Sequence, residues 1–201
     1  MLDCQTDQSA SNFLSPDLKK KVLALRVEGD GNCFYRSLSM LLFGNESYHE
    51  EMRVRCAVVM SLNPDTFLNG ENWVEPHELL DPDEIMRIAL LTASSFEGNS
   101  VLTFQKEVLE VVKDKSFAGL FQFFAGAFIL QRPIQSVYPM CGLHEYKKHC
   151  NRTIRPPNCV HEEKVFVMWT NSSGSSASPW VADHFVPLYL RRKSVVPKSN
   201  Y

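Results

Sequence analysis

The order of hydrophobic and polar positions along the chain predicts helices first and strands last. Apolar residues recur at helical spacing from Cys33, and Gly44 closes that run. Helical spacing returns at Met52, Val54, Ala57, Val58 and Leu62 and breaks before Pro64. Further helices are expected over 15–27, where Ser15 is the N-cap and Pro16 the first helical residue, and over 82–95, 101–115 and 117–132.

Strand patterns are confined to the last third of the chain. The segments "PIQSVYP" (133–139), "KVFVMWT" (164–170) and "WVADHFVPLYL" (180–190) are predicted strands, while 139–163 is predicted to be a polar loop and 171–179 a flexible connection. This order excludes regular alternation of strands and helices and predicts an α+β fold. We expect one domain over 16–190, a flexible N-terminal lead-in over 1–15 and a fraying tail over 191–201.

Composition and charge narrow the classes of function. The chain has 201 residues, of which 44% are hydrophobic, and 21 basic residues nearly balance 23 acidic ones. This balance gives no support to nucleic-acid binding or attachment to a membrane surface. Neither an apolar stretch of membrane-spanning length nor a secretory signal is seen, so we interpret the six cysteines as reduced thiols and expect a cytoplasmic or nuclear monomer.

The stretch "EGDGNCFYR" (28–36) places Cys33 at the end of a glycine-rich turn and the start of a predicted helix. A thiolate attacks carbonyl groups far better than a thiol, and a helix N-terminus or a neighbouring imidazole lowers the pKa of a cysteine. The backbone N–H groups of such a turn also suit a developing oxyanion. A cysteine merely buried at the start of a helix is the alternative, and a partner histidine decides between them.

His184 is the best placed of six histidines to be that partner. It lies on a strongly predicted strand, which would hold a general base rigidly, whereas His49 and His77 lie in polar stretches. A lone histidine at such a position is more often a core residue. Together with the cysteine turn, it predicts a Cys33–His184 pair for nucleophilic catalysis.

The residues around Cys33 resemble the signature of the ovarian-tumour (OTU) family of cysteine deubiquitinases. The match in "GDGNCFYRSLS" consists of Asp30, Gly31, Asn32, Cys33, Phe34 and Arg36. The segment "DHFVPLYL" resembles the family's late histidine strand. The segment "FQFFAGAFILQRPIQSVY" resembles its central helix and the strand that follows, including Arg132, Pro133 and Ile134.

This resemblance implies a papain-like α+β fold, with a small central sheet packed between helices, that hydrolyses isopeptide bonds at the C-terminus of ubiquitin. Cys33 would be the nucleophile of this thiol protease, His184 its base, and Asp30 an active-site residue that shapes the oxyanion loop with Gly31 and Asn32. The implied partners are ubiquitin, polyubiquitin chains or a ubiquitin-like modifier, with no metal or other cofactor. Trp180 is a candidate border of the cleft for the ubiquitin tail, and core anchoring is its alternative role.

One position departs from the family pattern. Many members carry Asp or Asn two residues after the histidine to orient its ring, but this chain has Val186 there. Asp183 is a poor substitute because neighbours on a strand point to opposite faces. Asp30 or Asn171 could serve instead. The alternative function is therefore an OTU-like ubiquitin-binding module that has lost efficient turnover.

A third possible function, that of a zinc-dependent interaction domain, rests on the segment 141–161. It contains Cys141, His144, His149, Cys150, Cys159 and His161, a high density of zinc-ligand types. Their spacing does not match the paired units of structural zinc sites, and an exposed loop is the plainer interpretation.

Overall fold

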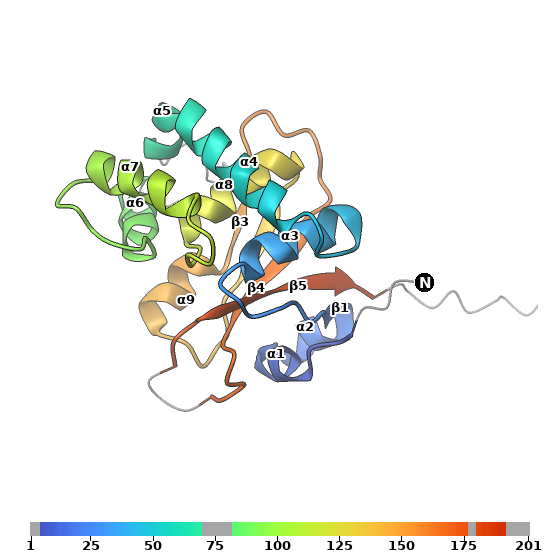
Figure 1. Ribbon diagram of the computed structural model, residues 1–201. Coiled ribbons are helices and arrows are strands. Elements are labelled where there is room, and N and C mark those ends of the chain that lie inside the picture. Colours follow the sequence, from blue (N-terminus) through green and yellow to red (C-terminus); the bar gives the residue numbers. More distant parts are fainter. Residues whose placement is uncertain (1–4, 70–81, 177–179, 192–201) are drawn as a thin grey trace, which may run out of the picture.

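The computed structural model describes residues 5–69, 82–176 and 180–191, and it contains one five-stranded sheet with helices on both faces (Figure 1). The helices are α1 (Gln8–Phe13), α2 (Pro16–Lys21), α3 (Cys33–Phe43), α4 (His49–Leu62), α5 (Pro64–Leu68), α6 (Pro82–Leu91), α7 (Ser100–Val111), α8 (Leu120–Leu130) and α9 (His144–Cys150). The strands are β1 (Val22–Ala24), β2 (Ile134–Val137), β3 (Arg152–Ile154), β4 (Val165–Thr170) and β5 (His184–Leu190).

The strands lie in the order β1-β5-β4-β2-β3. β4 pairs parallel to β2 and antiparallel to β5, and β5 also pairs antiparallel to β1. The register of β4 and β5 places Thr170 opposite His184 and Met168 opposite Val186. His184 therefore begins a strand that is paired along both edges, and the predicted α+β class with a small central sheet between helices is confirmed.

One face of the sheet packs against α3 and α8 through aromatic rings. Phe185 on β5 contacts Phe34 on α3 at a centroid distance of 5.5 Å and Trp169 on β4 at 4.7 Å. Phe123 on α8 stacks on Trp169 at 5.2 Å. Phe121, Phe123 and Phe124 of α8 are buried in the core, and this aromatic cluster fixes α3, the helix that begins with Cys33, on β5.

The opposite face is covered by the first two helices. Figure 1 shows α1 and α2 on the other side of β5 from α3. Phe13 and Leu18 share a hollow there with Val137 and Phe166, whose side chains alternate away from the aromatic cluster. Val186 and His184 follow the same alternation, so both belong to the face that α1 and α2 cover.

Several predicted helix boundaries are confirmed by their caps. Ser15 Oγ accepts a hydrogen bond from the backbone N–H of Leu18, and Pro16 is the first residue of α2. Gly44 ends α3 with a φ of 75°. The helix predicted over this stretch is found as α4, but three of the five apolar positions that predicted it, Val54, Val58 and Leu62, are exposed. Arg53 is buried beside the core instead.

The N-terminal lead-in is ordered where the structure describes it. Asp7 Oδ1 caps α1 by accepting a hydrogen bond from the N–H of Ala10, and Thr6 bridges to Leu25 beside the sheet. The helix predicted from Pro16 also stops early, because residues 22–24 pair with β5 as β1. The predictions for residues 1–4 and 192–201, and for the end of the connection at 177–179, lie outside the described residues.

The prediction of a structureless polar loop over 139–163 is wrong. This segment contains α9 and β3, and β3 pairs antiparallel with β2. Asn151, between the two elements, accepts a hydrogen bond from the N–H of Tyr138 and donates to the carbonyl oxygens of Tyr138 and Lys147. These tertiary contacts hold two short elements that leave little periodic signal in the sequence.

Candidate active site

Cys33 is the first residue of α3, and its side chain is 2% exposed. Burial raises the pKa of the Cys33 thiol to about 11, although the backbone N–H groups of Phe185 and Phe34 favour the thiolate. The nearby Asp30 carboxylate adds to the increase. The helix N-terminus predicted to lower this pKa is therefore outweighed by desolvation, and Cys33 is a thiol at neutral pH.

The turn before Cys33 is built around the Asp30 carboxylate. Asp30 accepts hydrogen bonds from the backbone N–H of Asn32 at 2.9 Å, from Asn32 Nδ2 at 3.1 Å, and from Arg36 Nε and Nη2 at 3.2 and 2.8 Å. The Arg36 guanidinium holds the pKa of Asp30 well below its usual range, against the opposing effect of burial. Arg36 also pairs with Glu28 at 3.0 Å and Glu46 at 3.3 Å. Asp30 is therefore an ionised residue that shapes the turn.

The backbone N–H groups that could stabilise an oxyanion differ in their hydrogen bonding. The backbone N–H of Asn32 is occupied by Asp30 Oδ1, so this amide is engaged within the turn. Those of Asp30 and Gly31 donate to no group in the described part of the chain. Gly31 has a φ of +86°, and a Cβ at its position would lie 2.2 Å from the carbonyl oxygen of Lys115. Only glycine fits at this position, and the two unengaged N–H groups lie three and two residues before Cys33 in the chain.

His184 lies beside the same turn, at the start of β5. A Cβ built on Gly29 would lie 3.6 Å from both Cε1 and Nδ1 of the His184 ring. Burial lowers the pKa of His184, while the carboxylates of Asp7 and Asp183 act in the opposite direction. The ring is therefore neutral at pH 7, the state that a general base needs.

The structure brings Cys33 and His184 to one place through two short segments. The sulfur lies by the N–H of Phe185, the residue after His184, and the imidazole lies by Gly29, four residues before Cys33. Among the described residues, no hydrogen bond joins the thiol to the ring. The resting pair is a neutral thiol beside a neutral imidazole.

None of the candidate orienting residues reaches the His184 ring. The Asp183 carboxylate accepts hydrogen bonds from the N–H and Oγ of Ser172, and Asn171 Nδ2 donates to the carbonyl oxygen of Ser175. Val186 is fully buried and apolar. Within the described chain His184 Nδ1 has no hydrogen-bond partner, and neither has Oγ1 of Thr170, its cross-strand neighbour on the same face.

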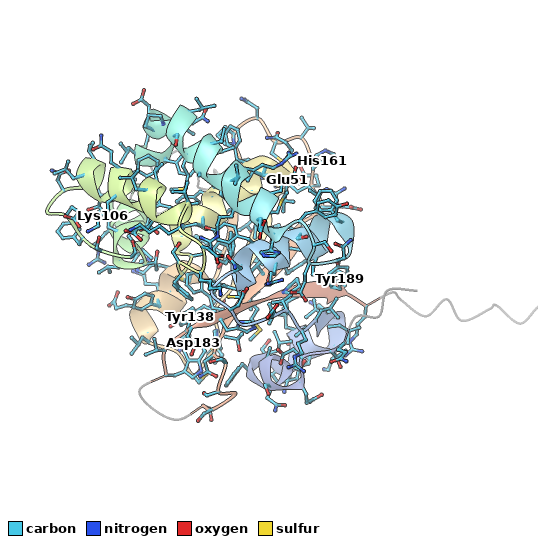
Figure 2. All side chains as sticks on the ribbon, viewed as in Figure 1. Glu51, Lys106, Tyr138, His161, Asp183 and Tyr189 are labelled. Atoms are coloured by element: carbon cyan, nitrogen blue, oxygen red, sulfur yellow. The ribbon has the colours of Figure 1, made fainter. Side chains whose placement is uncertain are left out.

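A cavity of about 300 Å³ adjoins the start of β5. Phe117, whose ring stacks on Phe185 at 5.1 Å, and Ala182, two residues before His184, both line it. Trp180 lines it as well but is 2% exposed and packs against Phe13 and Tyr138, so it combines a core position with a place in the cavity wall. Figure 2 labels Tyr138 and Asp183 near this end of the sheet and Tyr189 near the other end of β5.

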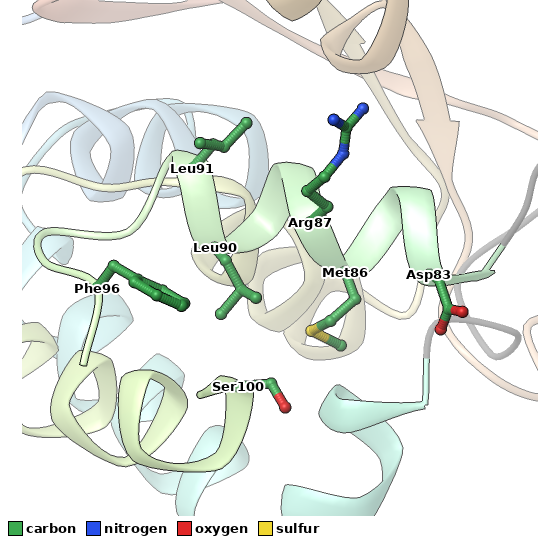
Figure 3. Close-up of a pocket in the computed structure, with 7 residues that line it drawn as sticks. All are labelled: Asp83, Met86, Arg87, Leu90, Leu91, Phe96 and Ser100. Carbon is green, nitrogen blue, oxygen red and sulfur yellow. The ribbon is translucent and has the colours of Figure 1, made fainter. Parts of the chain in front are cut away.

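A second hollow, of about 470 Å³, lies between α6 and α7 (Figure 3). Its lining is mostly apolar and consists of Asp83, Met86, Arg87, Leu90, Leu91, Phe96 and Ser100. None of the predicted site residues belongs to it.

The candidate zinc ligands are spread over different environments. His149 and Cys150 are buried on α9, whereas Cys141 is exposed. Nowhere in residues 5–69, 82–176 and 180–191 do three His, Cys, Asp or Glu side chains gather closely enough to hold a metal ion. The five cysteines in these ranges are free, and no helix there is long and apolar enough to span a membrane.

Sequence reasoning missed Arg53, which contacts the cysteine turn from α4. Its Nε and Nη2 both donate to Asn32 Oδ1, at 3.0 and 2.7 Å. Arg53 lies next to Met52 and one helical turn before Cys56 and Ala57, which form the buried side of α4, but the equally apolar Val54 and Val58 hid that side in the sequence.

Comparisons with known proteins identify relatives of this chain and structures that share its fold. The chain is 27% identical to human vertnin over 175 residues, or 82% of this chain, and 30% identical to vertnin of Danio rerio over 187 residues, or 86%. It spans about a quarter of the length of these relatives.

Solved structures with the same fold include the OTU domain of OTUD1, at a TM-score of 0.51 and 16% identity over 90% of this chain and 93% of that one. The viral OTU domain protease from Dera Ghazi Khan virus has a TM-score of 0.51 and 17% identity over 87% and 85%. The papain-like OTU fold implied by the sequence is therefore confirmed. The family described as "Vertnin, OTU domain" matches residues 24–170, a range that includes Cys33 and ends before His184, and the chain belongs to this OTU-domain family.

Proposed function

We propose that this chain is a cysteine-type deubiquitinase that hydrolyses isopeptide bonds at the C-terminus of ubiquitin or a ubiquitin-like modifier. The observation that carries the proposal is the placement of the Cys33 sulfur against the N–H of Phe185, the residue that follows His184. The OTU fold supports it, as does the description of one structural neighbour as a protease. The free cysteines fit a reducing compartment, the cytoplasm or the nucleus, which is part of the proposal.

The proposed reaction begins with the neutral pair. His184 accepts the proton of the Cys33 thiol as the sulfur attacks the carbonyl carbon of the modifier's last residue. The resulting oxyanion would be stabilised by the unoccupied N–H groups of Asp30 and Gly31. His184 then donates its proton to the leaving lysine amine as the C–N bond breaks and a thioester remains. Water, deprotonated by His184, attacks the thioester and releases the modifier's carboxylate and the Cys33 thiol.

The binding site for the modifier is part of this proposal. An extended C-terminal tail must reach Cys33 past the start of β5, where Phe117, Trp180 and Ala182 line the cavity of about 300 Å³. An apolar wall of this kind suits a peptide segment whose backbone is extended. Trp180 would form that wall without exposing its buried ring.

The second candidate function is a ubiquitin-binding module without efficient turnover. The observation that favours it is the absence, among the described residues, of any hydrogen bond to the His184 ring. An imidazole without an orienting partner spends less time in its working tautomer and orientation.

Reaction with ubiquitin that carries a thiol-reactive C-terminal group tests the proposal. Intact mass should show one adduct on the wild-type protein, none on Cys33→Ala, and a slower reaction for His184→Ala. Hydrolysis of ubiquitin joined to a fluorescent amine should follow the same order. Binding of ubiquitin by the folded wild-type protein, with neither adduct nor hydrolysis, would reject the enzyme in favour of the binding module.

A further inference from the structure

Arg53 is a buried cation that ties the cysteine turn to a second loop. It lies on the side of α4 that faces the core, and it is 5% exposed. Besides its two hydrogen bonds to Asn32 Oδ1, it donates from Nη2 to the carbonyl oxygen of Gly31 at 3.1 Å. Burying a guanidinium costs free energy unless all its N–H donors have acceptors. The acceptors around this position therefore specify an arginine.

The remaining bonds of Arg53 go to the last residue of α7 and to the segment that joins α7 to α8. Nη1 donates to the carbonyl oxygens of Val111 at 2.9 Å and Lys113 at 2.8 Å and to Ser116 Oγ at 2.9 Å. Nη2 donates to the carbonyl oxygen of Ser116 at 3.1 Å. Arg53 therefore holds the turn at 30–32 and the loop at 111–116 in one arrangement.

The two segments also touch directly. The space beside the Gly31 Cα is filled by the carbonyl group of Lys115, and Asn32 Nδ2 donates to Asp114 Oδ1 at 2.9 Å. Asn32 thus stands between the Arg53 cation at its oxygen and the carboxylates of Asp30 and Asp114 at its nitrogen. The positive charge at the oxygen and the negative charges at the nitrogen fix the orientation of the Asn32 side-chain amide.

Arg53 also contacts the helix that presents the nucleophile. Its guanidinium carbon lies 4.2 Å from the centroid of the Tyr35 ring, and Tyr35 is fully buried in the first turn of α3. Arg53 therefore contacts the chain on both sides of Cys33. Its hydrogen bonds are to residues 31 and 32, before Cys33, and its cation–π contact is to Tyr35, after it.

We propose that Arg53 is the positioning residue of the oxyanion site, an inference that rests on the proposed function. In a trans peptide the C=O and N–H groups point in opposite directions, so the bond from Arg53 to the Gly31 oxygen sends the Asn32 N–H toward Asp30. A flip of this peptide would turn the Gly31 oxygen toward the Asp30 carboxylate, where the oxygens would repel each other and the turn before Cys33 would lose its hydrogen bond. Arg53 disfavours the flipped state and so holds the shape of the turn that carries the Asp30 and Gly31 amides, without touching substrate itself.

The test compares Arg53→Met and Arg53→Lys with the matched control Arg55→Met. Arg55 lies on the same helix but is exposed and bonds to Glu51, which Figure 2 labels. With the ubiquitin–amine substrate, we expect kcat of Arg53→Met to fall on the order of 100-fold, KM to stay within about threefold, and Arg53→Lys to lie between Arg53→Met and the wild type. The control should match the wild type.

Two further measurements separate positioning from loss of structure. Alkylation of Cys33 by iodoacetamide forms no oxyanion, so its rate should be unchanged in Arg53→Lys. Amide hydrogen exchange should accelerate in peptides that cover 28–34 and 111–116 and remain unchanged in those that cover β4 and β5. If Arg53→Met does not fold, Arg53→Lys decides by the same measurements.

The outcomes distinguish this inference from the proposed function. A wild-type protein that hydrolyses nothing rejects the function, and hydrogen exchange then decides whether Arg53 holds the turn. Unchanged exchange at 28–34 in Arg53→Lys overturns the inference. So does a folded Arg53→Met protein with wild-type kcat, or one in which kcat and the alkylation rate fall together.

Discussion

The buried thiol of Cys33 leads to a quantitative prediction about its reactivity. Unfolding returns the pKa of this cysteine from about 11 to its ordinary value of 9.0. A difference of two units means about 100-fold less thiolate in the folded chain at any pH below 9. Because the thiolate is the species that reacts with alkylating agents, folded Cys33 should react at least about 100-fold more slowly than the same residue in denaturant.

The assay is a pH series of iodoacetamide alkylation between pH 6 and 9.5, with the Cys33 peptide quantified by mass spectrometry. Slow access to a buried sulfur would lower every rate equally, so the pH dependence is the informative quantity. The rate in the folded protein should rise about tenfold per pH unit over the whole series, with no plateau. His184→Ala should show the same slope, because the neutral ring does not hold a thiolate in the resting state.

A plateau above pH 6 or 7 in the wild-type protein, lost in His184→Ala, would refute this reasoning. It would mean that Cys33 and His184 form a thiolate–imidazolium pair in solution. Burial would then be weaker than the described geometry indicates, and the proposed reaction would begin from the ion pair.

Further predictions concern stability. Val186→Asn should destabilise the fold by about 1–3 kcal/mol in urea titrations, because Val186 is fully buried and an amide there lacks an evident partner; higher turnover at unchanged stability would instead show that the new side chain orients His184. Gly31→Ala should cost at least about 1 kcal/mol from its positive φ and lose activity through its clash with Lys115, so a wild-type urea midpoint would contradict the described turn. Phe123→Ala should cost about 3–5 kcal/mol in the same titration, since the ring is fully buried among aromatic neighbours. The lowered pKa of His184 means that the unfolded chain takes up its proton first as pH falls, so stability should decrease below about pH 6.5, and this decrease should be smaller in His184→Gln.

The sequence was most informative where periodicity and caps act locally. The start of α3 at Cys33, its end at Gly44 and a strand that contains His184 follow from patterns within a dozen residues, although this strand was predicted from Trp180 and begins at His184. The short β3 strand could not be predicted in this way, because three residues carry no period and their structure depends on pairing with β2. The outward side of α4 was equally hidden, since Val54 and Val58 are as apolar as the residues that face the core.

The candidate site also combines features that the sequence predicted with features that depend on the folded structure. Cys33 and His184 were found from a motif and a strand, but their protonation states depend on burial, which a sequence does not display. The engagement of Asp183 with Ser172 is a contact across the end of the sheet that spacing alone does not reveal. Arg53 resembles any charged residue on a helix until the partners of its guanidinium are known.

The place of β5 between β1 and β4 has a consequence for expression of this domain. A recombinant fragment cut at residues 24 and 170, the limits of the family match, would lack β5 and leave the edge of β4 without its neighbour. Unpaired, apolar strand edges recruit strands from other molecules and lead to aggregation or strand exchange. The same cut would remove His184 and uncover the aromatic cluster that holds α3. A fragment intended for crystallisation or enzymology should therefore extend from at least Gln5 to Arg191, which keeps the edge bonds of β1 and the Arg191 N–H bond to the Lys21 carbonyl.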